Sequence, residues 1–288
     1  MLFNALLNEF VEYMRINERS PKTIYGYQKD VAAFLRFYEA RYNCPCYVED
    51  VSAQDIEDFV RFLKAKGLKP QSRNRIVHAF RSLYKFAVRR RIVEVNVAEK
   101  VETVRIHRKE RTYLTPEEVS TLIESMENPL MKLVTNTLFN TGLRISECLN
   151  LRIRHVDFPN RVIRVVSGKG RKDRLIPINE KLCPLLEEYR REKRFAAKPD
   201  DPFFATETTG RLCASYYNHY LRRTTERQLG WTKRVTAHTL RHSFASTLVH
   251  RGANLVRVQK LLGHSSLATT SVYTHATLED LTEAVNVL

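Results

Sequence analysis

The sequence predicts a mainly α-helical protein of two domains, with a small antiparallel β-sheet in the C-terminal domain. The chain has 288 residues, which exceeds one typical domain of roughly 100 to 200 residues. Apolar residues recur at helical spacing along the first 110 residues, whereas period-2 alternation begins only after residue 160. We therefore expect a helical domain first, and then a helical domain that contains a β-hairpin.

The charge balance indicates a polyanionic partner. The chain has 48 Lys and Arg residues against 32 Asp and Glu residues, a formal net charge of +16. Such an excess is typical of proteins that bind nucleic acid. An acidic membrane is the competing partner, but a membrane-surface helix concentrates its charge opposite one apolar face. Here residues 1–111 and 112–288 each contribute half of the excess, which favours nucleic acid.

No part of the sequence predicts export or a membrane span. No run approaches roughly 18 uncharged apolar residues, and the first ten residues lack the basic start and cleavage site of a signal peptide. The five cysteines include no CxxC pair, which suits neither a disulfide framework nor a zinc site. We expect a cytoplasmic protein with reduced cysteines, no metal and no membrane partner.

Four helices are expected in the first domain, residues 1–98. Apolar residues recur at helical spacing in residues 2–14, and Ser20-Pro21 supplies a cap and a first-turn proline for the second helix. Gly67 should end the third helix. The expected ranges of the last three helices are Lys22–Tyr42, Ala53–Lys66 and Ser72–Arg91.

A strongly basic segment runs from Phe59 to Val93. It contains eleven Lys or Arg residues and no Asp or Glu. A solvated helical face is the ordinary explanation for such a run, but the lack of compensating acids favours contact with DNA phosphates. The residues predicted to bind DNA are Lys69, Arg73, Arg75, Arg81, Lys85, Arg89, Arg90 and Arg91.

A polar, basic linker is expected at residues 99–112, and the second domain at residues 113–288. Thr115, Pro116 and Glu118 form a capping box with a first-turn proline, which predicts the start of a helix. The expected helices of this domain are 116–127, 130–141, 145–150, Cys183–Arg194, Ala214–Gln228, Thr239–His250 and Leu255–Leu262. Two strands, Arg161–Val166 and Arg174–Ile178, should pair as a hairpin around residues 167–170.

Arg144 is the first candidate for chemistry. Gly142 should end the preceding helix in the left-handed conformation, so that Arg144 leads into a new helical turn in a fixed direction. A surface contact with an acid such as Glu147 is the competing role.

Lys169 lies between two glycines at the tip of the expected hairpin. The backbone there can enter a groove, and the long side chain can place a proton beside a phosphate. A solvated turn is the alternative, since glycine and lysine are common in hairpin loops.

The segment His238-Thr239-Leu240-Arg241-His242 places an imidazole and a guanidinium three residues apart, on one face of a predicted helix. Two phosphate donors would then lie side by side. Zinc is the alternative ligand, but the segment lacks the central Glu of a zinc hydrolase, and Arg241 would repel a cation.

Two further candidates follow the last of these helices. Gly263 should end that helix in the left-handed conformation, so that His264 leaves it in a fixed direction. Tyr273 is either a buried aromatic residue or an exposed hydroxyl nucleophile, and its position alone does not decide between the two.

Together these candidates comprise two arginines, a lysine, two histidines and a tyrosine, without a carboxylate cluster. Guanidinium and imidazole groups can stabilise the negative charge that grows on phosphate oxygens in a transition state. The set therefore predicts cleavage of a phosphodiester without a metal ion.

In order and approximate spacing, these motifs resemble those of the tyrosine recombinase, or phage integrase, family, in its Xer-like branch. The resemblance covers nearly the whole chain and implies a two-domain clamp of a SAM-like core-binding domain and a catalytic domain. The motifs that carry it are Ser20-Pro21-Lys22-Thr23, Gly142-Leu143-Arg144-Ile145-Ser146-Glu147, Gly168-Lys169-Gly170, His238-Thr239-Leu240-Arg241-His242, Leu262-Gly263-His264 and Tyr273-Thr274-His275.

The resemblance implies a role for each central residue. Tyr273 would attack the scissile phosphate and form a 3′-phosphotyrosyl link. Arg144 and Arg241 would hold the phosphate oxygens, and Lys169 would protonate the departing 5′-hydroxyl. The free 5′-hydroxyl of a partner duplex would then reverse the reaction.

The other residues would assist. His238 would be the acid/base partner of the tyrosine, His264 a phosphate donor, and Glu147 would help to position Arg144. The protein–DNA ester conserves the energy of the broken bond, so the resemblance implies no ATP and no cofactor.

The resemblance also implies a homotetramer that joins double-stranded DNA at a specific core site and passes through a Holliday junction, on nucleoid DNA. Residues 277–288 are expected to form a short amphipathic helix that docks on a neighbouring protomer or, alternatively, in cis. This tail is short beside those of chromosome-dimer-resolving relatives, so a resolvase or integrase of a transposon or plasmid fits equally.

Two other functions compete with recombination. A type IB topoisomerase shares the chemistry but relaxes any supercoiled duplex as a monomer. A catalytically silent DNA-binding regulator would bind DNA without a covalent adduct, and the complete residue set argues against it.

Overall fold

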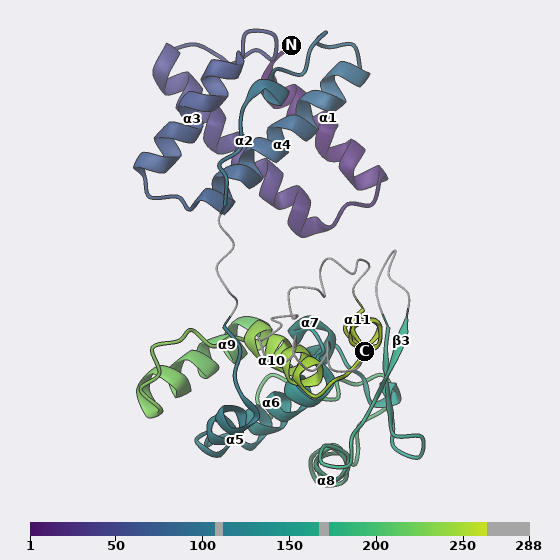
Figure 1. Ribbon diagram of the computed structural model, residues 1–288. Coiled ribbons are helices and arrows are strands. Elements are labelled where there is room, and N and C mark those ends of the chain that lie inside the picture. Colours follow the sequence, from purple (N-terminus) through teal and green to yellow (C-terminus); the bar gives the residue numbers. More distant parts are fainter. Residues whose placement is uncertain (107–111, 167–172, 264–288) are drawn as a thin grey trace, which may run out of the picture. The chain divides into compact units, whose positions relative to one another are not determined.

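The computed structural model describes residues 1–106, 112–166 and 173–263 (Figure 1). It divides into two compact units, Met1–Lys109 and Glu110–Leu288. Each unit has a hydrophobic core of its own. The predicted fold class is confirmed, because the first unit is helical and the second combines helices with a small antiparallel sheet.

The first unit packs four helices around an aromatic core. Phe3, Phe34 and Phe80 are fully buried in mutual edge or tilted contact. The helices are α1 (Phe3–Ile16), α2 (Pro21–Tyr42), α3 (Ala53–Ala65) and α4 (Pro70–Arg89), followed by the short 3-10 helix η1 (Val97–Lys100).

The helix boundaries follow the predicted caps closely. The Ser20 hydroxyl accepts a hydrogen bond of 3.1 Å from the Thr23 backbone N–H, and Gly67 follows α3 with a φ of 80°. The predicted start of α4 at Ser72 is two residues late, because Pro70 occupies the first turn and Lys69 the N-cap.

The chain after α4 folds back along that helix. The Arg81 guanidinium donates from Nε to the Ala98 carbonyl at 3.2 Å and from Nη2 to the Val101 carbonyl at 2.6 Å. The Asn74 side chain donates to the Val104 carbonyl at 2.8 Å and accepts from its N–H at 2.9 Å. These bonds fix the first part of the predicted linker to the first unit.

The second unit is built around α6, which packs against α10, with α5 alongside both. The helices are α5 (Pro116–Glu124), α6 (Pro129–Thr141), α7 (Ile145–Leu149), η2 (Ile153–His155), α8 (Cys183–Lys193), α9 (Ala214–Arg223), the π-helical turn η3 (Thr224–Gln228), α10 (Ala237–His250) and α11 (Leu255–Leu262). The predicted helix 214–228 is thus an α-helix whose end widens into a π turn.

A three-stranded antiparallel sheet, ordered β1-β2-β3, completes this unit. The strands are β1 (Val156–Asp157), β2 (Val162–Val165) and β3 (Arg174–Pro177). The predicted hairpin pairing is confirmed in the register Val165 opposite Arg174. The strand β1 was not predicted, because its two residues are too few to show alternation.

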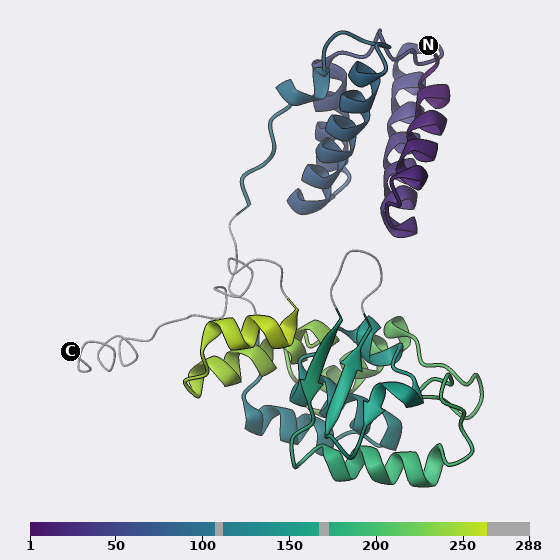
Figure 2. The same ribbon diagram turned by 90° about the vertical axis from the view of Figure 1, so that its right-hand side faces the viewer.

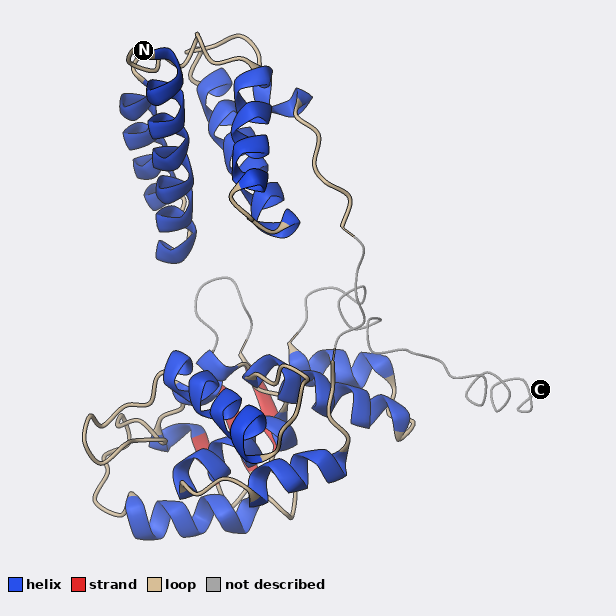
Figure 3. Ribbon diagram, turned by 90° about the vertical axis from the view of Figure 1, so that its left-hand side faces the viewer, coloured by secondary structure: helices blue, strands red, loops and turns tan. Residues whose placement is uncertain are grey.

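The sheet has one covered and one open face. Ile163, Val165 and Ile176 are buried, whereas Arg164 and Leu175 between them are exposed. The helices lie over the covered face in Figure 3, and the opposite face is turned to the viewer in Figure 2. The three apolar residues therefore join the core beneath the helices.

The cysteines and the helix lengths bear on the environment expected for the chain. Cys46, Cys148 and Cys183 are buried, Cys44 and Cys213 are exposed, and all five are free thiols. None of the helices in the described part of the chain combines the length and the apolar character needed to cross a membrane.

Candidate active site and nucleic-acid interface

The turn between α6 and α7 sets the direction of Arg144. Gly142 ends α6 with a φ of 62°, as predicted. A Cβ at this position would lie 2.3 Å from a Phe244 ring carbon and 2.9 Å from a Leu262 methyl carbon. Only glycine therefore satisfies both the left-handed backbone and the close packing at this corner.

Glu147 holds Arg144 in place. The backbone N–H of Arg144 donates to Oε2 of Glu147 at 2.8 Å, and its Nη1 donates to Oε1 at 2.7 Å. Nη2 of Arg144 also lies 3.4 Å from the carbonyl oxygen of Gly263. The side chain of Arg144 remains 22% exposed, so the carboxylate directs a guanidinium that solvent still reaches.

Arg241 on α10 is almost completely buried, with 5% of its side chain exposed. Its Nη1 donates to the Gly142 carbonyl and its Nη2 to the Leu262 carbonyl, both at 2.6 Å. Nη1 lies 3.9 Å from Oε2 of Glu147. One guanidinium therefore joins the α6–α7 turn to the end of α11.

Arg174, the first residue of β3, completes this cluster and was not predicted. Its Nη2 and Nη1 donate to the two oxygens of Glu147 at 2.8 and 3.2 Å. A signal was present in the sequence, because Arg174 lies two residues before Ile176 and thus on the buried face of the strand. An arginine on such a face requires a buried partner.

We call these four residues, Arg144, Glu147, Arg174 and Arg241, the Glu147 cluster. The net charge of the cluster is positive. Burial raises the pKa of Glu147, but hydrogen bonds and charge from Arg174 and the Arg144 N–H outweigh it and lower that pKa to about 2. The carboxylate is therefore ionised at neutral pH and is outnumbered by three guanidinium groups. The arrangement suits an anionic ligand.

His238 lies in the first turn of α10, whose start is capped by Thr236. Its side chain is exposed, whereas Arg241 one turn later is buried. Leu240 and Phe244 face the core, as predicted.

Three predicted site residues, Lys169, His264 and Tyr273, lie outside the described residues, as does the predicted tail helix 277–288. Their assigned roles stay predictions. The helix before His264 is described. Asn254 caps the start of α11, and Gly263 ends it with a φ of 63°, as predicted.

Six of the eight predicted DNA-binding residues are exposed, and Arg75 is the one of these six that pairs with a buried acid. Lys69 lies at the N-cap of α4 and Lys85 within it, and Arg89, Arg90 and Arg91 lie at its end. The Arg90 guanidinium stands 5.5 Å from the centre of the Phe86 ring, which orients it at the surface. These side chains are available to phosphates.

Of the other three, Arg75 and Arg81 have structural partners, whereas the buried Nε of Arg73 has no hydrogen-bond partner among the described residues. Arg73 is 7% exposed, Arg75 forms a bidentate pair with the buried Asp30, and Arg81 holds the chain after α4. The acidless run from Phe59 to Val93 is therefore compensated in part by an acid far away in the sequence. These three residues are therefore less available to phosphates than the other five, and their role in DNA binding stays a prediction.

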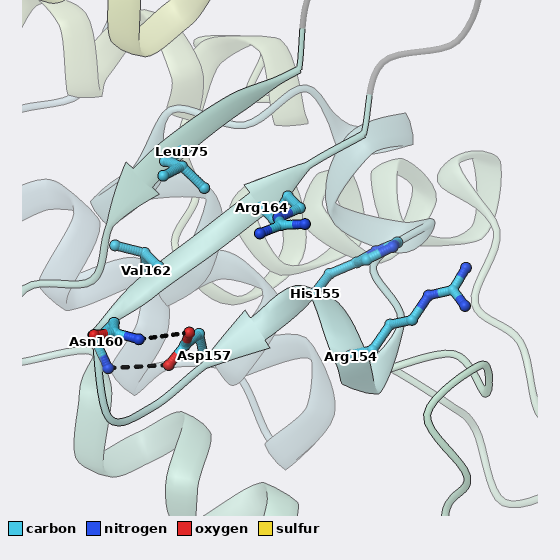
Figure 4. A pocket seen from close by; sticks show the side chains of 7 residues that line it. All are labelled: Arg154, His155, Asp157, Asn160, Val162, Arg164 and Leu175. Carbon is cyan, nitrogen blue, oxygen red and sulfur yellow. Dashed lines mark hydrogen bonds between the residues drawn. The ribbon is translucent and has the colours of Figure 1, made fainter.

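A separate pocket of about 390 Å³ lies on the open face of the sheet (Figure 4). Arg164, Leu175, Asp157 and Asn160 are among the residues that line it, and Asn160 donates from its N–H and its side-chain amide to Asp157 at 3.0 and 2.8 Å. It contains none of the predicted site residues.

Among the described residues there is also no group of three or more His, Cys, Asp or Glu side chains that could hold a metal ion.

Known proteins match the chain along nearly its whole length. The model of the phage integrase family matches residues 112–279, and that of the phage integrase N-terminal SAM-like domain matches residues 7–91. A tyrosine recombinase of Pseudothermotoga lettingae is 33% identical over 287 residues, 98% of each chain. The tyrosine recombinase XerA of Pyrococcus furiosus is 33% identical over 99% of this chain and 94% of its own.

The fold matches as well. The solved structure of the Tn1549 transposon integrase in complex with a circular intermediate DNA has a TM-score of 0.81 and 21% sequence identity. The match covers 98% of this chain and 99% of that one. Together with the matching sequence motifs, these likenesses assign the chain to the phage integrase family of tyrosine recombinases.

Proposed function

We propose that the chain is a site-specific DNA recombinase that cuts and rejoins double-stranded DNA through a 3′-phosphotyrosyl intermediate. The observation that carries this function is the Glu147 cluster. It fixes Arg144 and Arg241, the two arginines of the family motifs, around one buried carboxylate. Such a fixed group of cations can stabilise the charge that develops on a scissile phosphate.

The chemistry needs no external energy source. The Tyr273 hydroxyl attacks phosphorus, the new bond joins its oxygen to the 3′-phosphate, and the bond to the 5′-oxygen breaks. Lys169 gives its proton to that oxygen, and His238 takes the proton of the tyrosine. Arg144, Arg241 and His264 hold the phosphate oxygens, in the roles of the family motifs.

The second part of the proposal concerns DNA binding. The exposed cations of α4 lie in the first unit, which matches the SAM-like domain of the family. We propose that Lys69, Lys85 and the Arg89–Arg91 run contact the phosphate backbone and position the duplex.

Assembly belongs to the same proposal. DNA is supported as a partner by the Tn1549 integrase, whose structure contains it. We propose that four copies act together on two duplexes, that residues 277–288 dock on a neighbouring protomer, and that the protein acts on nucleoid DNA in the cytoplasm. Recombination is favoured over topoisomerase activity because the similar relatives are named recombinases.

The deciding experiment traps the covalent intermediate. The full chain is incubated with a pool of duplexes that carry one nick and randomised flanking sequence, so that cleavage releases a short fragment and the ester persists. We expect wild-type protein to accumulate a protein–DNA adduct without added metal, and sequencing of the adducts to give the core site. Tyr273→Phe should bind the recovered duplex within about twofold of wild type and form no adduct.

Two results would overturn the proposal. The first is an adduct formed by Tyr273→Phe. The second is relaxation of supercoiled plasmids that lack the recovered site, at substoichiometric protein, which would indicate a topoisomerase.

A further inference from the structure

Arg174 joins two separate parts of the candidate site. Two nitrogens of its guanidinium bind the Glu147 carboxylate, and the third, Nε, donates to the Leu261 carbonyl at 2.9 Å. Its side chain is only 11% exposed. All three guanidinium nitrogens of Arg174 thus donate hydrogen bonds, two to Glu147 on α7 and one to the end of α11.

Each of these two partners also supports an arginine of the family motifs. Glu147 holds the backbone N–H and the guanidinium of Arg144. The end of α11 accepts a hydrogen bond from Arg241 at the carbonyl next to that of Leu261. A displacement of either partner would therefore move a guanidinium that the proposed function assigns to the scissile phosphate.

The packing around Arg174 leaves little room for another arrangement. A Cβ on Gly263 would lie 3.1 to 3.2 Å from the guanidinium atoms of Arg174. The guanidinium therefore lies close against the backbone of the last residue of the turn, directly before His264 in the sequence. Arg174 also follows Lys169 by five residues, at the base of the same hairpin.

We propose that Arg174 is a positioning residue for DNA cleavage, which locks Glu147 and the end of α11 together so that Arg144 and Arg241 are aligned on the phosphate. The proposal rests on the proposed function. It requires an arginine, because a lysine has one nitrogen and cannot serve the carboxylate and the Leu261 carbonyl in the same way.

The test uses the full chain and the nicked duplex recovered in the trapping experiment. Arg174→Gln should lower the single-turnover cleavage rate at saturating protein by about 100-fold, because alignment of a pre-organised donor is lost. The Kd for the same duplex should change by less than about threefold. Arg174→Lys should recover part of the rate, since one charged contact to Glu147 is restored.

A double-mutant cycle identifies the partner through which Arg174 acts. In a Glu147→Gln background, Arg174→Gln should add less than about threefold to the loss, because the two residues act as one unit. Arg164→Gln is the matched control, since it removes an arginine from the open face of the same sheet and should leave the cleavage rate unchanged.

Failure of this inference differs from failure of the proposed function. If wild-type protein forms no adduct, the proposed function fails. If wild type cleaves and Arg174→Gln cleaves within twofold of it, or if the losses of Arg174→Gln and Glu147→Gln multiply in full, the positioning role is wrong. Arg174→Gln could also lower the affinity for DNA by the same factor as the cleavage rate, with no recovery in Arg174→Lys. That result would show that Arg174 only stabilises the fold, and the positioning role would be wrong.

Discussion

The exposed end of α4 and the Glu147 cluster are both rich in arginine, but their arginines have opposite surroundings. Arg89, Arg90 and Arg91 are exposed at the surface of the first unit. In the second unit Arg174 and Arg241 are 11% and 5% exposed and donate to a carboxylate and to backbone carbonyls. The first group can attract a long polyanion, whereas the second can only hold a small anionic group in one geometry.

This difference shows why net charge alone does not locate a site. A solvated guanidinium contributes through long-range attraction that salt screens. A buried guanidinium with fixed acceptors loses that adaptability but is already oriented when the substrate arrives. The two regions should therefore respond differently to the same substitutions.

The largest contrast is expected for loss of a single arginine. Arg241→Ala removes the donor of two buried carbonyls and a neighbour of Glu147, and should lower the free energy of unfolding by about 3 to 5 kcal/mol. Arg90→Ala should cost less than about 1 kcal/mol, since Arg90 is exposed where its guanidinium stands over the Phe86 ring. Urea denaturation of each full-length variant measures both free energies of unfolding. Equal losses in the two variants would contradict the predicted difference between the buried and the exposed arginine.

The second contrast concerns acid. The pKa of Glu147 is lowered from 4.5 to about 2, so its contribution to stability is complete above about pH 4.5 and is lost as the pH falls toward 2. The shift corresponds to about 3 kcal/mol. Unfolding measured from pH 6 to pH 2 should show this loss in wild type, and its removal in Glu147→Gln. The same acid dependence in both proteins would assign it to other carboxylates.

The smallest effect is expected for the surface of α4. Replacing Arg89, Arg90 and Arg91 by Gln should weaken DNA binding about tenfold at moderate salt and reduce the log–log salt slope by about 0.9 for each phosphate that is no longer bound. Arg81→Gln is the control, because Arg81 holds Ala98 and Val101 and should leave the slope unchanged. Fluorescence anisotropy at several salt concentrations measures the slope. If the salt slope changed only for Arg81→Gln, Arg81 and not Arg89, Arg90 and Arg91 would contact the DNA phosphates.

Much of the second unit could be predicted from local sequence. The left-handed turns at Gly142 and Gly263 and the cap at Thr115 all depend on residues within four positions of one another. The pairing of Arg144 with Glu147 is equally local, at three residues' separation. Caps, turns and ion pairs between residues this close in the chain can therefore be predicted from the sequence alone.

The remaining features depend on contacts between distant segments. Arg75, whose role in DNA binding stays a prediction, pairs with Asp30, which lies 45 residues away on another helix. Arg174 was missed because Glu147 is 27 residues before it and Leu261 is 87 residues after it. No window of sequence contains such a set, and only the folded chain brings it together.

The tight corner at Gly142 has a consequence for anyone who wishes to engineer variants of this protein. A methyl group there would overlap both Phe244 and Leu262, so the corner tolerates no diversity. Mutant libraries should instead vary the exposed residues Arg89, Arg90 and Arg91, where side chains can change without disturbing a closely packed core. The chain thus separates an exposed surface that tolerates substitution from a closely packed corner that does not.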